Sequence, residues 1–308
     1  MVKGKYFAGL LVFSIPFLLF LQSVSFEFTN FDDHLIIHHN HAFLSHSSNI
    51  PEAFTRDAFC REQGTFYRPL QLVSYIIDLQ SGEPYFRLHL TNILLFGLAV
   101  FLLYILLVGF SIPWQNAAIG TVMYGVHPLF VSVSTWIPSR GDLLLTIFAL
   151  LSFLLLTDYL QKRRTVCYIL HWLAFVFALF SKETAIVLPV LYYCYHRAFY
   201  PDIKINKRQV MIAAGYLFVV MLWLWIRTAA IGGDGNNSGY GETGFIAVMA
   251  NLRTIPESVS ALFIPADIDP IPSFSVFKTI SGVLIILFLV LWIIRSKYSS
   301  KGILIFGV

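Results

Sequence analysis

The stretch that decides the fold is LHLTNILLFGLAVFLLYILLVGF, residues 88–110, which contains no Asp, Glu, Lys or Arg. A helix needs about 20 predominantly apolar residues to cross the hydrocarbon core of a bilayer. Because this stretch is long enough and uncharged, it is predicted to form a membrane-spanning helix. Similar stretches lie on both sides of it.

The apolar composition extends over the whole chain. Of its 308 residues, 57% are hydrophobic and 12% are charged, whereas roughly a quarter of the residues in a soluble domain are charged. The net charge of +4 comes from basic residues scattered among apolar stretches, which excludes a nucleic-acid-binding surface. Five further stretches have the composition of membrane spans: residues 6–26, 117–136, 143–160, 209–228 and 279–294.

The segment 165–196 is too long for one ordinary span and carries the polar tripeptide Ser-Lys-Glu at 181–183. Basic residues flank it, at 161–164 and at 196–208. Since cytoplasmic loops are enriched in Lys and Arg, both flanks are expected in the cytoplasm, which requires two short spans that fold back at Ser-Lys-Glu. The expected fold is an all-α polytopic bundle of about eight transmembrane helices with a cytoplasmic N-terminus.

Two long segments are expected on the extracytoplasmic side, residues 27–87 and 229–278. Within the first, residues 51–59 and 67–79 mix aromatic, aliphatic and charged side chains, as helices lying in the membrane interface do. The second begins with a glycine-rich tract at 232–239, which suits a mobile lid or a plain linker. The first also holds five histidines, whose spacing lacks the order of metal-binding motifs, so no metal site is expected: His34, His38, His39, His41 and His46.

The two ends of the chain leave alternatives open. Ser23-Val24-Ser25 loosely fits a signal-peptide cleavage site, so the first span could instead be a signal peptide. In either case Asp32 and Asp33 lie outside. Residues 302–308 look like the start of a ninth helix, so the chain is expected to be truncated at its C-terminus.

Short polar motifs follow one another at the predicted extracytoplasmic ends of the spans. They are FDDHLIIHHN (31–40), FYRPL (66–70), HLTN (89–92), HP (127–128), SRGDLL (139–144) and SKET (181–184). In this order and on this side of the membrane they resemble the membrane half of the transmembrane and tetratricopeptide-repeat O-mannosyltransferases and their bacterial relatives, within the GT-C superfamily of lipid-sugar-dependent glycosyltransferases. The resemblance covers residues 1–200 as one GT-C-like module, to which residues 201–308 add further helices.

The resemblance implies a multi-pass enzyme of the bacterial inner membrane or the endoplasmic reticulum, with its active site on the periplasmic or luminal face. It implies inverting transfer of a sugar such as mannose from a polyprenyl- or dolichyl-phosphate donor to a hydroxyl of a protein or glycan acceptor. The family's catalytic base is an acidic residue in the first external loop, which matches Asp32, although Asp33 could serve instead. The chain departs from the family at 127–132, where HPLFVS replaces H-P-x-H-x-E, and this leaves donor and acceptor specificity open.

The residue types suit such a transfer. A carboxylate beside a second carboxylate can have its pKa raised toward the range useful for a base. The leaving phosphate needs cations at the membrane surface, so no metal or other cofactor is required. The candidate phosphate-binding residues are Arg68, Arg140 and Lys182, and the candidate supporting residues are Asn40, His89, Asp142 and Glu183.

Other interpretations of the same charges stay open. Ionisable residues at membrane depth are often paired, so Lys182 could simply neutralise Glu183. Arg140 could likewise form an interfacial salt bridge with Asp142. The same side chains could instead line the path of a transporter or lipid flippase, although the sequence shows no internal repeat. A noncatalytic scaffold is a further alternative, but it would not need acid and base at one surface.

Overall fold

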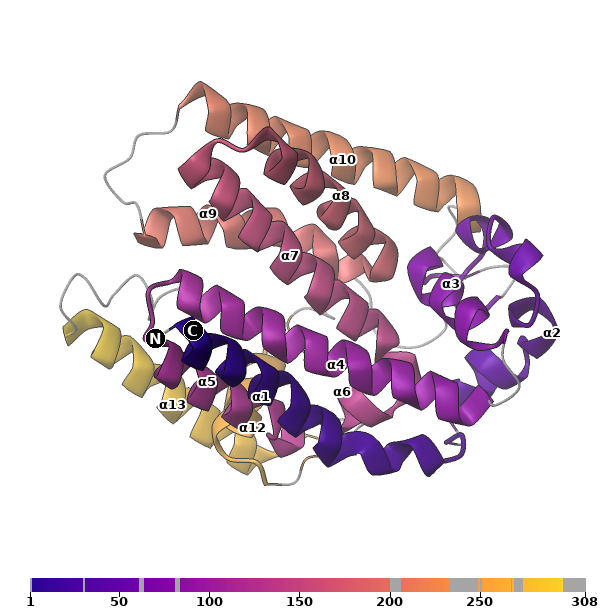
Figure 1. Ribbon diagram of the computed structural model, residues 1–308, viewed down its shortest axis with the longest axis horizontal. Helices are drawn as coiled ribbons and strands as arrows, with labels where there is room; N and C mark the ends of the chain where they lie inside the picture. Colours follow the sequence, from indigo (N-terminus) through magenta and orange to yellow (C-terminus); the bar gives the residue numbers. More distant parts are fainter. Residues whose placement is uncertain are drawn as a thin grey trace. The chain divides into compact units, whose positions relative to one another are not determined.

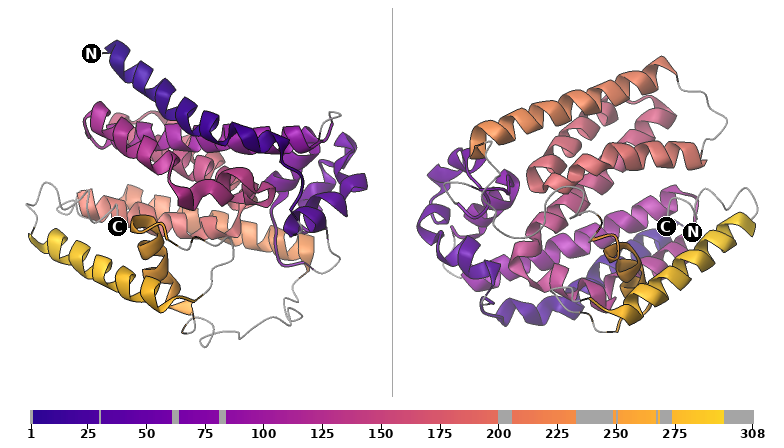
Figure 2. Two further views of the ribbon diagram at one scale, coloured as in Figure 1. Left: turned by 90° about the horizontal axis from the view of Figure 1, so that it is seen from below. Right: turned by 180° about the vertical axis from the view of Figure 1, so that it is seen from behind.

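The computed structural model describes residues 2–29, 31–60, 64–80, 84–199, 206–232, 249, 251–266, 268 and 274–295. Every regular element in these ranges is a helix or a helical turn, as Figure 1 and Figure 2 show. The all-α prediction is therefore confirmed for the part of the chain that the structure describes.

Within the described ranges, five segments are long and apolar enough to cross a membrane. This number of spans marks the chain as a multi-pass membrane protein. The segments are Lys3–Ser25, formed by α1 (Val2–Phe20) and η1 (Leu21–Ser25), α4 (Pro84–Gly109), Ile137–Lys162, formed by η6 (Ile137–Ser139) and α7 (Arg140–Lys162), α10 (Lys207–Ile231) and α13 (Val276–Arg295).

The predicted span at 117–136 is broken. Helix α5 (Trp114–Gly125) ends before His127, and the next segment, Pro128–Thr135, is bent by 55° relative to it. This second segment consists of η5 (Pro128–Phe130) and α6 (Val131–Thr135). Because proline cannot continue the hydrogen-bond ladder of a helix, Pro128 explains the position of the break. The pair is either one broken span or a re-entrant loop.

The predicted interruption at Ser-Lys-Glu is present. Helix α8 (Thr165–Ser181) has 17 residues and ends at Lys182, whose backbone is extended with φ −160° and ψ 138°. A 3-10 turn, η7 (Glu183–Val187), and then helix α9 (Leu188–Phe199) follow. Since α8 and α9 are each shorter than an ordinary bilayer crossing, the total of eight spans stays a prediction.

The chain forms two compact units, Met1–Pro189 with Asn206–Gly235, and Val190–Ile205 with Asn236–Val308. In the first unit, the start of α1, the end of α7 and the start of α10 lie at one side, and α2 (His41–Leu44) and α3 (Pro69–Asp78) lie at the opposite side (Figure 1). This sorting agrees with the predicted orientation, because the ends on the first side are the basic ones. The predicted boundary of the GT-C-like module at residue 200 depends on motifs and stays a prediction. In the structure, α10 belongs to the same compact unit as the helices before residue 190.

In the second unit, α12 (Thr254–Phe263) packs along α13. Ser260 and Ser281 join the two helices with a hydroxyl–hydroxyl distance of 2.7 Å, and Thr279 donates to Glu257 at 2.8 Å. Polar contacts thus join two helices whose other side chains are mostly apolar. The glycine-rich tract from 233, with the rest of 233–248 in the predicted loop 229–278, and the predicted ninth helix at 302–308 lie outside the described residues.

The first long loop, residues 27–87, folds around an apolar core. Its helical segments are η2 (His34–His38), α2, η3 (Ser47–Asn49), η4 (Glu52–Thr55) and α3. Helix α3 contributes Leu72 and Ile76 to the core, which also contains Ile37 and Leu44. Residues 67–79 therefore contain the predicted helix, whereas 51–59 contain only the short turn η4. Their placement in the membrane interface stays a prediction.

A buried histidine joins α10 to α7 and α8. His171 lies 2.9 Å through Nδ1 from the Ser152 hydroxyl of α7 and 2.9 Å through Nε2 from the Tyr216 hydroxyl of α10. The helices approach closely here, because a Cβ atom at Gly215 would come within 2.7 Å of the Trp172 ring. Interhelical hydrogen bonds of this kind contribute about 0.6–1.7 kcal/mol within membranes.

Replacing Tyr216 with Phe should therefore lower the free energy of unfolding by about 1 kcal/mol. The change removes the hydroxyl beside His171 and keeps the ring. The measurement is equilibrium unfolding of the purified protein in detergent micelles. The matched control is Tyr6→Phe, since the Tyr6 side chain is exposed and its loss of a hydroxyl should change little. Equal stability of the Tyr216→Phe variant and the unchanged protein would contradict the expectation.

Candidate active site

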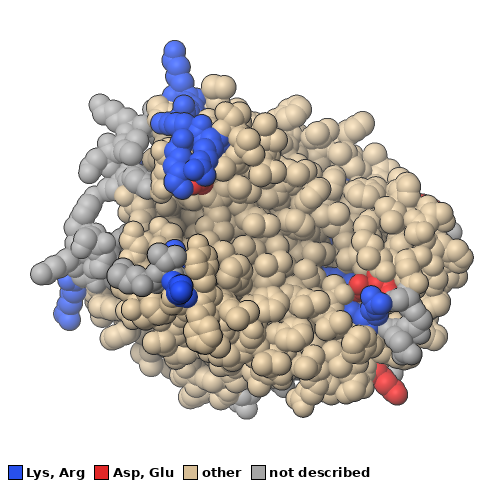
Figure 3. Space-filling model, in the orientation of Figure 1, with Lys and Arg blue, Asp and Glu red and all other residues tan. Residues whose placement is uncertain are grey.

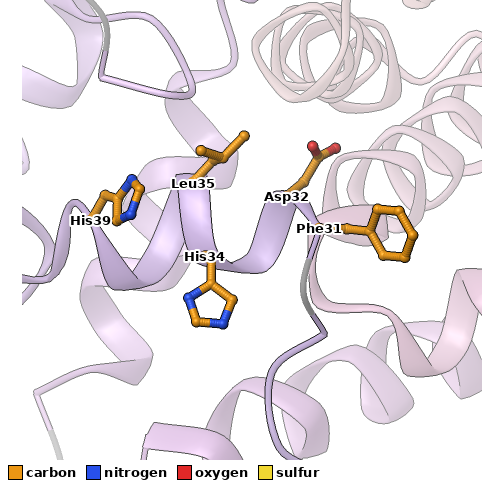
Figure 4. Close-up of a pocket in the computed structure, with 5 residues that line it drawn as sticks. All are labelled: Phe31, Asp32, His34, Leu35 and His39. Carbon is orange, nitrogen blue, oxygen red and sulfur yellow. The ribbon is translucent and has the colours of Figure 1, made fainter.

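Asp32 lies at the start of the helical turns that follow the first span. With Phe31, His34, Leu35 and His39 it lines an open hollow of about 490 Å³. Figure 4 shows the Asp32 carboxylate and Leu35 projecting to the same side of the turn, and His34 to the other. The next residues form a π-helical turn, His34–His38, a wide geometry that is frequent at functional sites. Asp32 is half-buried and can be reached from the hollow.

Asp33 is placed quite differently from its neighbour. Its side chain is buried, with 1% of the residue exposed, and its Oδ2 accepts bonds from the Thr29 backbone at 2.8 Å and the Thr29 hydroxyl at 2.6 Å. Burial raises the pKa of Asp33, the Thr29 bonds lower it, and the charge of Asp32 raises it further. Asp33 therefore fixes the backbone beside Asp32, and only Asp32 faces the hollow.

Arg68 forms a bidentate ion pair with Glu183. Its Nε lies 3.0 Å from Glu183 Oε2, and its Nη2 lies 2.6 Å from Oε1. Arg68 immediately precedes α3, and its guanidinium lies 4.7 Å from the centre of the Phe66 ring. The side chains are 14% and 30% exposed, so the pair lies at the edge of the protein. The alternative in which Glu183 merely neutralises its neighbour Lys182 is therefore wrong.

Lys182 pairs with Asp142 instead. Its Nζ lies 2.6 Å from Asp142 Oδ1, and both side chains are partly exposed. The extended backbone at Lys182 sends its side chain toward the first turn of α7, away from the side taken by Glu183. The predicted alternative of a salt bridge between Arg140 and Asp142 is also wrong, since Asp142 pairs with Lys182 and Arg140 pairs elsewhere.

Arg140 is fully buried, with none of its surface exposed. Its guanidinium donates to Asn92 Oδ1 at 2.8 Å, to Asp78 Oδ2 at 2.5 Å and to the Leu88 carbonyl at 2.6 Å. It also lies 4.7 Å from the centre of the Tyr75 ring. The predicted role of Arg140 in binding a donor phosphate does not fit this structure, because each nitrogen of its guanidinium already donates to the protein and no solvent reaches it.

One partner of Arg140, Asp78, belongs to a polar face of α3 that sequence reasoning missed. Asp78 also accepts from Thr91 at 2.9 Å, while Gln71 donates to the Pro138 carbonyl at 3.0 Å and Tyr75 to the Ile137 carbonyl at 3.1 Å. Gln71, Tyr75 and Asp78 are spaced i, i+4 and i+7, which places them on one helix face. This spacing was the signal in the sequence.

Tyr75 shows that the charged groups share one neighbourhood. Burial raises the pKa of the Tyr75 phenol to about 12, the positive charges of Arg140 and Arg68 oppose this rise, and the negative charge of Asp33 adds to it. The ring therefore lies within electrostatic reach of Asp33 and of both arginines. Asp32 is the chain neighbour of Asp33 and lines the hollow. The hollow therefore lies at the same end of the first unit as Tyr75 of α3.

A glycine lets three helices meet beside this site. A Cβ atom at Gly141 would come within 2.9 Å of Gln71 Oε1 and within 3.3 Å of the Ser181 carbonyl oxygen. Any larger side chain would force the Gln71 amide, and to a smaller extent the end of α8, to shift. The two ion pairs depend on this close approach of the helices. Arg68 reaches Glu183 across it, and Asp142 reaches Lys182.

The remaining predicted supporting residues are structural here. The Asn40 amide donates to the carbonyls of Leu35 at 2.7 Å and Phe59 at 3.2 Å, which ties the helical turns to the loop behind them. His89 is buried and packs edge-on against Phe26. Neither side chain lines the hollow.

The histidines of the first loop do not gather around one point. His34 and His38 lie 5.2 Å apart by ring centres, whereas His41 contacts Ser45 and His46 contacts the Ala42 carbonyl. Within the described ranges, no group of three or more His, Cys, Asp or Glu side chains could hold a metal ion.

Comparison with known proteins gives no further guide to this site. The chain matches no protein-family model, no curated protein and no solved structure. Any functional conclusion therefore depends on the chemistry and geometry of its own side chains.

Arg140→Lys should destabilise the protein by about 3 kcal/mol, because a lysine keeps the charge but its single nitrogen cannot reach acceptors that are spread around a planar guanidinium. Unfolding in detergent micelles would measure the loss. Arg56→Lys is the matched control. Its ion pair with Glu52 is exposed, with 40% of the Arg56 side chain accessible, and should lose at most about 1 kcal/mol. A loss at position 140 no larger than this control would show that the buried network contributes little.

The raised pKa of Asp33 predicts a pH effect on stability. Since the folded state holds this proton more tightly than the unfolded chain, stability from this group is full below its ordinary pKa of 3.8 and falls as pH rises through the raised value. Asp33→Asn can keep an oxygen acceptor for Thr29 and should remove this dependence. The measurement is unfolding across the acidic pH range, with Asp32→Asn as the neighbouring control. An unchanged pH profile in Asp33→Asn would contradict the prediction.

Proposed function

We propose that the chain is a membrane glycosyltransferase that moves a sugar from a polyprenyl- or dolichyl-phosphate donor to an acceptor hydroxyl. The observation that carries the proposal is the contrast within the acidic pair. Asp33 is buried and bonded to Thr29, while Asp32 faces an open hollow. An accessible carboxylate held by a rigid neighbour is what a general base needs.

Asp32 is the proposed base. It would take the proton of the acceptor hydroxyl as the acceptor oxygen forms its bond to the anomeric carbon of the sugar. The bond from that carbon to the phosphate oxygen breaks at the same time, and its electron pair leaves with the lipid phosphate. Attack opposite to the leaving group inverts the anomeric centre, as the resemblance to O-mannosyltransferases implies. Asp33 acts as a positioning residue in this scheme.

The phosphate would be bound by Arg68 and Lys182. Both are partly exposed, and each is held by a carboxylate, Glu183 or Asp142. A lipid phosphate offers more acceptor oxygens and more negative charge than one carboxylate, and charge-assisted bonds to such groups are strong. We therefore expect the donor to draw these cations from their carboxylates as it binds. Arg140 supports the site from beneath and does not contact the donor.

The proposal includes the wider expectations drawn from the sequence. It comprises a GT-C-like bundle of about eight spans, in the bacterial inner membrane or the endoplasmic reticulum, with the site on the periplasmic or luminal face and no metal or cofactor needed. The basic ends of α7 and α10, opposite to α3, support this orientation by the positive-inside rule. The acceptor is a protein or a glycan.

Asp32→Asn should lower sugar transfer by about 10²–10⁴-fold, the usual contribution of a general base. The assay uses membranes containing the expressed protein and radiolabelled polyprenyl-phosphate mannose or glucose, and it counts label in the protein and glycan fractions. Undiminished transfer by Asp32→Asn would remove Asp32 as the base.

The matched control is Asp33→Asn, which changes the adjacent carboxylate. It should keep most of the transfer, since an asparagine oxygen can still accept from Thr29 and Asp32 is unchanged. If Asp33→Asn alone abolishes transfer in a folded protein, the base is Asp33. A transporter or flippase would give a different result, with donor crossing the bilayer and no label incorporated by any form of the protein.

A further inference from the structure

Two basic segments that are far apart in the sequence meet at the end of the first unit opposite to α2 and α3. Lys162, Arg163 and Arg164 lie at the turn between α7 and α8, and Lys207 and Arg208 begin α10. They are joined by an aromatic contact, because the Arg208 guanidinium lies 5.5 Å from the centre of the Tyr159 ring of α7. We name these five cations the basic patch.

The basic patch is exposed and poorly neutralised. The side chains of Lys162 and Arg164 are 55% and 64% exposed. Asp158 contacts both of them, and it is the single carboxylate among the described residues of these helix ends. Figure 3 shows that charged side chains gather at a few places on this face, including one mainly basic group, and that wide uncharged areas separate them.

Helix stability does not account for this arrangement. Lys207 and Arg208 occupy the first turn of α10, where positive charge opposes the helix dipole. The positive-inside rule accounts for basic residues in each loop separately. It does not require that residues 162–164 and 207–208 converge beside one tyrosine. Their convergence brings five cations together against one carboxylate, which favours an anionic partner.

Apolar side chains lie immediately beyond the basic patch. Val166 and Ile169 of α8, and Val210 and Met211 of α10, are all exposed large hydrophobic residues. The tilted rings of Tyr159 and Tyr168 lie 4.6 Å apart beside the charged residues, with Arg208 over the Tyr159 ring, and tyrosine is enriched at the level of lipid headgroups. Charge, then tyrosine, then apolar surface is the order of a phospholipid from headgroup to acyl chain.

We propose that the basic patch is a binding site for anionic phospholipids of the cytoplasmic leaflet. The lipid phosphate and headgroup would contact the cations, and the acyl chains would lie along the apolar faces of α8 and α10. Clusters of four to eight basic residues next to a membrane helix commonly bind anionic lipids. The apolar surface distinguishes a lipid from free phosphate. The proposal does not depend on sugar transfer.

The test is lipid retention by the full chain. The purified protein is exposed to mixed micelles of phosphatidylglycerol and phosphatidylcholine, and native mass spectrometry counts the lipids that stay bound. The double variant Arg164→Gln with Arg208→Gln should bind phosphatidylglycerol about 30-fold more weakly, since each surface basic residue contributes roughly 1 kcal/mol. Lys162, Arg163 and Lys207 remain in this variant and preserve the orientation signal.

The control is Arg56→Gln combined with Arg87→Gln, which removes the same charge from accessible side chains at the opposite end and leaves the proposed donor site unchanged. It should retain phosphatidylglycerol as the unchanged protein does, and added salt should weaken retention in the unchanged protein. Equal retention by the patch variant and the unchanged protein would overturn the proposal. So would an equal loss in the control, or retention of phosphatidylcholine as strong as that of phosphatidylglycerol. Competition by inorganic phosphate at equal concentration would identify an ion site in place of a lipid site.

Discussion

The charge of Arg140 is buried against the long loop 27–87 without contact with solvent, and the placement of that loop depends on how this charge is compensated. A buried charge is costly unless its partners supply both opposite charge and hydrogen bonds. Asp78 supplies the charge, and Asn92 and the Leu88 carbonyl supply the bonds. These partners come from α3 and α4, whereas Arg140 begins α7. One guanidinium therefore sets the relative position of three helices.

The surface charges of the proposed active site follow from this buried anchor. Helix α3 is held by Asp78 at its last residue and by Tyr75 and Gln71 along the same face. Its first residue follows Arg68, so fixing α3 also fixes where Arg68 meets Glu183. The molecule thus separates two kinds of charge, one buried and fully bonded, the other exposed and singly paired. Only the second kind is free to exchange partners with a substrate.

The features that could be predicted from the sequence are those that depend on the length of apolar stretches and on the residues that flank them. The all-α fold, the multi-pass character and the interruption at Ser-Lys-Glu follow from such local patterns. The partners of the charges do not. Lys182 and Glu183 are neighbours in sequence, but an extended residue directs successive side chains apart. Arg140 and Asp142 are two apart on a helix and face different directions, whereas Asp78 lies 62 residues before Arg140. Asp32 was recognised by resemblance, but its separation from Asp33 required the fold.

The bond between Arg68 and Glu183 joins residues 115 positions apart, which has a consequence for synthesis. A chain made from its N-terminus completes the first long loop before α7 and α8 exist. Until those helices are inserted, Asp78 lacks Arg140 and Arg68 lacks Glu183, so their charged groups must stay hydrated. The loop therefore reaches its final conformation late. A quality-control protease with access to this loop would meet it open in any chain whose synthesis or insertion stops before Glu183.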